Sequence, residues 1–261
     1  MLFRHIVFYA LLVGSLSGLV LTAVQFWQVI PIIQNAEVYE TQADPAATHS
    51  HDAGQAHSDH DHSSGEWAPQ NGTERTAFTL LSNILMAIGF ALILMVSMVA
   101  VPVLGRDKRY PHGFGQGLMW GAAGYVVFWL APALGLPPEI PGASAASLEA
   151  RQVWWLFTVL FTAAGLAGLA FGKSPWRWAA LVLLIVPHLV GAPHPPGAMF
   201  EGHTPEAAAA LESLAHRFIG ASAIANAVFW LAMGLAAVWC VQRIAPRRES
   251  GAASKMESPS V

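Results

Sequence analysis

The sequence is short of charge. Only 11% of its 261 residues are Asp, Glu, Lys or Arg, whereas soluble globular domains contain about 25%. Hydrophobic residues make up 54% of the chain, which is more than a soluble fold of this length could withdraw from water. The net charge of -3 and the lack of a long basic run give no reason to expect nucleic acid as a partner. The composition therefore indicates an all-α integral membrane protein whose partner is the lipid bilayer.

Cysteine and intramembrane carboxylates are also scarce. The single cysteine, Cys240, lies in the last apolar segment, so a disulfide framework is impossible. None of the long apolar stretches contains Asp or Glu in its interior, which is where proton-coupled pumps usually place a carboxylate. The chain therefore lacks an obvious means of energy coupling of its own, which favours a partner subunit or a passive pathway. We expect no enzymatic activity and no organic cofactor.

Long apolar stretches take up most of the chain. A helix needs about 20 mostly apolar residues to cross roughly 30 Å of hydrocarbon. The first stretch is longer than the 7–15 apolar residues typical of a signal peptide, so we expect it to be a retained helix. The six predicted spans are Ile6–Ile33, Ala77–Leu104, Gly117–Leu136, Val153–Phe171, Trp176–Val190 and Phe218–Val241.

The positive charges support this count. If six helices alternate from a cytoplasmic N-terminus, ten Lys and Arg residues fall on the inner side, and only Arg75, Arg151 and Arg217 fall outside. Cytoplasmic loops are enriched in Lys and Arg, so both termini are predicted to be cytoplasmic. The predicted organisation is one transmembrane domain over residues 1–245, with a flexible outer loop at 41–72, and a disordered cytoplasmic tail over 246–261.

Small and aromatic residues predict how the helices pack. Glycines four residues apart let two helix backbones approach closely, and Trp at span ends usually lies at the membrane interface. Trp27 and Trp154 are examples of such predicted interfacial anchors. The predicted packing pairs are Gly14/Gly18, Gly117/Gly121 and Gly168/Gly172.

The first outer loop is rich in histidine and aspartate, with five of the eleven histidines inside fourteen residues. Neutral imidazole is the commonest side-chain metal ligand, and carboxylates add oxygen donors and negative charge. The segment lacks apolar periodicity, so we expect a disordered loop that wraps around a divalent ion. A solubilising loop that binds metal only adventitiously is the alternative. The predicted loop ligands are His49, His51, His57, His60, His62, Asp52, Asp59 and Asp61.

Further candidate ligands flank the loop or lie near the last two spans. Glu37, Glu40 and Glu74 are predicted to hold the ion where the first two helices meet the loop. The proline-rich segment 187–196 is expected to break the fifth helix near the outer face. An ionisable residue at the membrane edge is a candidate site residue. The residues predicted to accept the ion between the later helices are His188, His194 and His216.

Several motifs are spread over nearly the whole chain. They include Glu37-Val-Tyr39-Glu40, Trp67-Ala-Pro69-Gln-Asn71-Gly72, Gly117-Leu-Met-Trp120-Gly121, Arg151-Gln152-Val-Trp154-Trp155, Pro187-His188-Leu-Val-Gly191 and Asn226-Ala-Val-Phe229-Trp230. With these motifs the chain resembles the CbtA family, proposed cobalt transporter subunits of bacteria. The resemblance implies a role in cobalt uptake linked to cobalamin synthesis, in the bacterial inner membrane. It also implies a small single-span partner, CbtB, with a histidine-rich tail of its own.

Three functions follow as hypotheses. The first is a membrane subunit of a divalent-metal uptake system, whose cargo is cobalt by resemblance, although the same donors suit nickel or zinc. The second is a membrane metal sensor or assembly factor that binds metal without moving it. The third, a haem-binding oxidoreductase subunit, is disfavoured because His188 is the only histidine close to lying within a span.

Overall fold

The computed structural model describes residues 2–43, 69, 72–104, 113–173, 176–195 and 197–244. Within these residues every regular element is a helix. The elements in chain order are α1 (Leu2–Val24), the π-helix η1 (Gln25–Val29), α2 (Ile30–Ala43), α3 (Thr73–Leu104), α4 (Gly113–Tyr125), the π-helix η3 (Val126–Leu130), α5 (Ala131–Ala133), α6 (Leu148–Phe171), α7 (Trp176–Val190) and α8 (Pro205–Ile244).

These elements join into six helical runs, because α1, η1 and α2 form one continuous helix, as do α4, η3 and α5. The predicted all-α fold is confirmed. In the part of the chain that the structure describes, four helices are long and apolar enough to cross a membrane by length and composition, and α7 is a shorter apolar helix. The 15 residues of α7 rise only about 22 Å. Six crossings therefore remain a prediction. The four long apolar helices are Leu2–Tyr39, Thr73–Pro102, Leu148–Phe171 and Pro205–Ile244.

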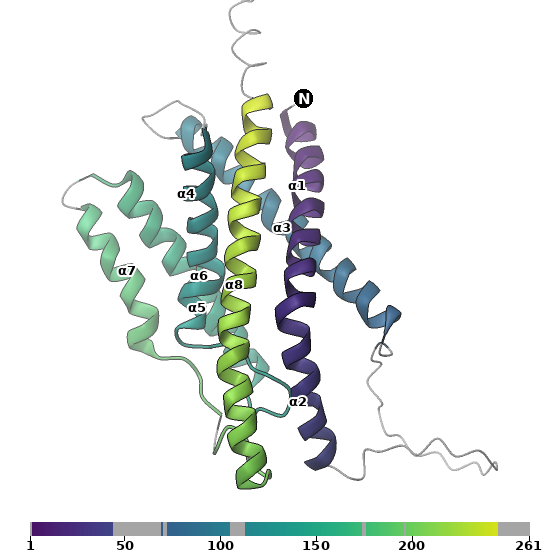
Figure 1. The fold of residues 1–261 in the computed structure, drawn as a ribbon. Helices are drawn as coiled ribbons and strands as arrows, with labels where there is room; N and C mark the ends of the chain where they lie inside the picture. Colours follow the sequence, from purple (N-terminus) through teal and green to yellow (C-terminus); the bar gives the residue numbers. More distant parts are fainter. Residues whose placement is uncertain are drawn as a thin grey trace, which may run out of the picture.

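Successive helical runs alternate in direction (Figure 1). The start of α1 and the end of α8 therefore lie at one end of the bundle, here called the terminal end. The opposite end, here called the loop end, holds the ends of α2, α5 and α7 and the starts of α3, α6 and α8. The chain between Ala43 and Thr73 leaves and re-enters the bundle at the loop end.

Glycines bring the helices of each main pair into backbone contact, as predicted. A Cβ added at Gly18 of α1 would lie 2.7 Å from Ile84 Cα on α3, and one at Gly121 of α4 would lie 2.5 Å from the Trp230 carbonyl oxygen on α8. A Cβ at Gly14 would lie 2.4 Å from Ile88 Cα on α3, and one at Gly117 would lie 3.0 Å from Leu235 Cα on α8. In lipid, such close packing replaces the hydrophobic effect as the force that holds helices together.

In the third predicted pair, Gly168 and Gly172, the two glycines have different roles. A Cβ at Gly168 would lie 2.6 Å from Ala180 Cβ, so this glycine packs α6 against α7. Gly172 instead ends α6, and its N–H donates to the Gly168 carbonyl at 2.8 Å. The packing prediction is thus confirmed for Gly168, while Gly172 serves the end of the helix.

Proline explains the two π-helical turns. Ile30 N–H donates to the Gln25 carbonyl and Ala131 N–H to the Val126 carbonyl, each five residues back. Each of these residues precedes a proline, Pro31 or Pro132. Proline has no N–H and its ring collides with the carbonyl four residues back, so a helix that continues through it must adjust locally. Widening by one residue is one such adjustment, and π-turns of this kind often occur at functional sites.

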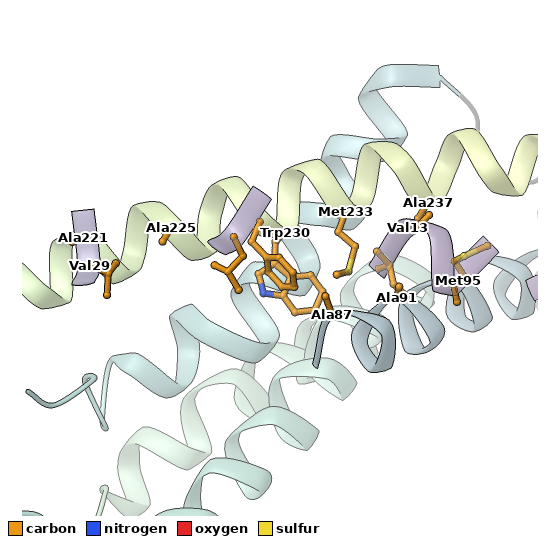
Figure 2. Packing of buried hydrophobic residues seen from close by; sticks show 14 of the residues in the cluster. Val13, Val29, Ala87, Ala91, Met95, Ala221, Ala225, Trp230, Met233 and Ala237 are labelled. Carbon is orange, nitrogen blue, oxygen red and sulfur yellow. The ribbon is translucent and has the colours of Figure 1, made fainter. Parts of the chain in front are cut away.

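Aromatic and small side chains from α1, α3, η3 and α8 fill the centre of the bundle. Trp230 stacks on Phe128 at a centroid distance of 5.2 Å and lies 5.1 Å from Phe90. Figure 2 shows Trp230 and Met233 between α8 and α3, beside small residues such as Ala87. Met233 is fully buried, as expected for a methionine that packs the core.

Candidate metal site

The end of α7 places His188 at the loop end. The helix stops at Val190 because Gly191 adopts a positive φ of 82°, a conformation that glycine adopts without strain. Gly191 N–H donates to the Pro187 carbonyl at 3.1 Å, which leaves His188 in the last turn. The break predicted within residues 187–196 therefore occurs at Gly191, and α7 ends at Val190 as the predicted span does.

His188 packs against a tryptophan rather than against another ligand. Its ring meets Trp154 of α6 edge to face, with centroids 6.2 Å apart. Trp154 is 6% exposed, and its indole nitrogen has no hydrogen-bond partner. The prediction that Trp154 is an interfacial anchor is therefore wrong, because the tight turn at Gly135 lets the ring lie inside the bundle. Trp27 is 78% exposed, and its role as an interfacial anchor stays a prediction.

The other two candidate histidines at the loop end lie on different segments. His194 follows α7 and His216 lies on α8, and both are exposed. Among the residues that the structure describes, no three His, Cys, Asp or Glu side chains come close enough to hold a metal ion. The described candidates therefore do not form a preformed centre. The predicted ligands outside the described residues are His49, His51, Asp52, His57, Asp59, His60, Asp61 and His62, and of Glu40 only the backbone is described.

Of the flanking carboxylates, Glu37 is held by an ion pair between α2 and α3. Arg75 Nη1 donates to Glu37 Oε2 at 3.1 Å, and Nη2 contacts Oε1. The two side chains are 34% and 31% exposed. Glu74 is the neighbour of Arg75 in the first turn of α3 and is partly buried. A metal ion at Glu37 would have to compete with the arginine for the carboxylate.

A second Arg–Glu pair lies at the same end. Arg151 Nη2 is 2.8 Å from Glu139 Oε2, between α6 and the loop that precedes it. Pairing with carboxylates offsets the positive charge of both arginines. In the sequence, Arg75 and Arg151 were interpreted only as two of the few positive charges on the outer side. Neither ion pair was predicted. Each arginine stands close to acidic residues near the start of a helix, and this pattern could have indicated the ion pairs.

A polar network that sequence analysis also left unassigned lies between α1 and α3. Asn83 is buried, and its Nδ2 donates to Thr22 Oγ1 at 3.0 Å and to Gln25 Oε1 at 2.6 Å. Thr22 in turn donates to the Gly18 carbonyl at 2.8 Å. Gln25 opens the π-helix, so the widened turn faces this amide cluster. The polar residues at 75, 76, 79, 82 and 83, spaced like one face of a helix, were the signal in the sequence.

Comparison with known proteins places the chain in a family. No curated protein and no solved structure matches the chain. The family described as "Probable cobalt transporter subunit (CbtA)" matches residues 3–242. The match runs from the first turn of α1 to the last turns of α8. The resemblance inferred from the motifs is confirmed, and the chain belongs to the CbtA family of probable cobalt transporter subunits.

Proposed function

We propose that this chain is the membrane-embedded subunit of a divalent-metal uptake system whose cargo is cobalt. The family supports transport of cobalt. The observation that carries the capture step is the position of the histidine-rich connection. It joins α2 to α3 at the loop end, which is also the end where His188, His194 and His216 lie.

The distribution of basic residues supports an orientation with the loop end outside. Basic residues lie at the start of α1, between α6 and α7, in the first turn of α7 and at the end of α8, all at the terminal end. They are Arg4, Lys173, Arg177 and Arg243. Cytoplasmic loops carry the excess of Lys and Arg. The terminal end therefore faces the cytoplasm of a bacterial cell, and the histidine-rich loop meets metal outside.

Uptake then proceeds in three steps. The loop histidines His49, His51, His57, His60 and His62 gather the ion with Asp52, Asp59 and Asp61, because imidazole and carboxylate groups are donors that divalent metal ions bind. Glu37, Glu40 and Glu74 hold the ion where the loop meets α2 and α3. His188, His194 and His216 accept it from there. A single-span, histidine-rich CbtB-like subunit supplies what the chain itself lacks for coupling.

Isothermal titration of Co²⁺, Ni²⁺ and Zn²⁺ into the purified chain tests capture. Changing His49, His51, His57, His60 and His62 to Ala should abolish the main binding event, whereas His5→Ala at the terminal end should leave it unchanged. Free imidazole titrates at about pH 6.5, and only its neutral form ligates metal. Metal binding should therefore weaken below about pH 6. A main binding event that is undiminished after the five substitutions would refute capture by the loop.

Transport of ⁵⁷Co²⁺ into proteoliposomes, with and without the partner subunit, separates uptake from sensing. Accumulation that depends on the five loop histidines supports the uptake subunit. Binding without accumulation in either preparation would replace it with the metal sensor or assembly factor.

A further inference from the structure

A cleft of about 550 Å³ separates the α1–α2 helix from the first half of α3. In Figure 1, α3 crosses α1 obliquely and diverges from α2 towards the loop end. The Asn83–Gln25 hydrogen bond closes the inner end of the cleft, and the Arg75–Glu37 ion pair bridges its outer end. Asn83 is ten residues into α3, so the cleft extends about 15 Å along the helix from the loop end.

One wall of the cleft is a polar stripe. Arg75, Thr76, Thr79, Ser82 and Asn83 recur at helical spacing on α3 and all line the cleft. Each unsatisfied polar group in hydrocarbon costs several kcal/mol. Polar side chains within a span therefore usually face protein or a water-filled cavity. The stripe indicates that water enters the cleft.

The hydrogen bonds leave oxygen lone pairs available along this stripe. Thr76 Oγ1 donates to the Gly72 carbonyl at 2.9 Å and Thr79 Oγ1 to the Arg75 carbonyl at 2.8 Å. With their protons committed to their own helix, both hydroxyls can only accept or ligate. Asn83 Nδ2 is the donor to Thr22, because the Thr22 proton goes to Gly18. Its Oδ1 is left without a donor among the described residues.

These atoms suit a cation better than an anion. Carbonyl, carboxylate and hydroxyl oxygens, with water, are hard donors that bind hydrated divalent metal ions. The positive charge of Arg75 is offset by Glu37. Six water molecules fill about 180 Å³, so the cleft has room for an ion that keeps part of its hydration shell.

We propose that the cleft is a water-filled vestibule in which a partly hydrated divalent cation passes Thr76 Oγ1, one turn nearer the loop end, and binds at Thr79 Oγ1 and Asn83 Oδ1. The identity of the ion as cobalt rests on the proposed function, whereas the vestibule itself does not. The vestibule leads from the loop end to the π-turn at Gln25.

Thiol labelling tests whether water reaches the cleft. In membranes containing the full chain, Thr79→Cys should react with an impermeant, cationic methanethiosulfonate added from the loop side. Ser97→Cys is the matched control, because Ser97 lies on the same helix, outside the cleft, with the same back-bonded hydroxyl. The native Cys240 is 1% exposed, so the unmodified chain gives the background. Absence of labelling at position 79 would overturn the vestibule.

Binding of ⁵⁷Co²⁺ tests the oxygen ligands. The measurement uses the full chain with His49, His51, His57, His60 and His62 changed to Ala, which removes any contribution from the loop. On this background Thr79→Val, which removes the oxygen at nearly constant volume, should weaken binding by about tenfold or more. Thr79→Ser and Ser97→Ala should retain it. Equal binding by Thr79→Val, or no binding on this background at all, would refute the cation site. If ⁵⁷Co²⁺ fails to accumulate in proteoliposomes, the proposed function is refuted but the vestibule is not.

Discussion

The helix pairs α1/α3 and α4/α8 share a packing motif but differ over the turns beyond it. Both are antiparallel pairs that touch at two glycines four residues apart. One turn after Gly121, Gly124 has no side chain, so the Trp230 ring of α8 packs directly against it and α4 and α8 remain in contact. Beyond Gly18 come Thr22 and Gln25, which bond to Asn83, and the helices diverge into the cleft. A glycine pair thus sets where two helices touch, and the next turns decide whether they stay together.

Breaking the closed pair should have the largest effect. In Gly121→Ala the new Cβ would lie 2.5 Å from the Trp230 carbonyl oxygen, a backbone atom that cannot move alone. Overpacking of this kind costs about 2 kcal/mol, which corresponds to a fall of about 4–8 °C in the melting temperature. Thermal unfolding of the purified chain in detergent measures it.

Gly220→Ala is the control for that prediction. Gly220 also lies in α8, but a Cβ there meets nothing within 4 Å. Alanine favours a helix by about 1 kcal/mol over glycine, so this variant should melt at the same temperature or higher. Equal destabilisation by both substitutions would show that the close contact at Gly121 is not what holds α4 to α8.

Removing the amide that joins α1 to α3 should have an intermediate effect. Asn83→Leu deletes two hydrogen bonds between helices. Such bonds average about 0.6 kcal/mol each in a membrane protein, so the loss should be about 1 kcal/mol. Asn226→Leu is the control, since among the described residues Asn226 bonds only to the Ser222 carbonyl of its own helix. If the two variants unfold at the same temperature, the Asn83 network does not couple α1 to α3.

The ion pair at the open end of the cleft should contribute least. Glu37 and Arg75 are each about one third exposed, and exposed pairs are worth about 0.2–1 kcal/mol. Glu37→Arg should lower stability by about that amount, and the double variant Glu37→Arg/Arg75→Glu should recover most of it. A double-mutant cycle in low salt and in about 1 M salt measures the coupling, which screening should reduce. No recovery in the exchanged pair would mean that the two charges are not coupled.

Much of the architecture could be read from the sequence. The six apolar runs, the turn after Pro187 and the contacts at Gly18 and Gly121 follow from local spacing, because a chain in lipid must satisfy its backbone within helices. The sequence did not reveal that Trp154 is buried beside His188. Burial of that ring depends on the approach of Gly135 and α7, which no local pattern encodes.

The sequence by itself determined that this chain is helical and apolar enough to cross a membrane, and its motifs pointed to the CbtA family. The tertiary structure alone decided which polar groups meet. Thr22, Gln25 and Asn83 are up to 61 residues apart in the chain, and Glu37 and Arg75 are 38 residues apart. The oblique crossing of α3 over α1 brings each set together, because the angle between two helices arises from contacts along both of them and is not a property of either helix alone.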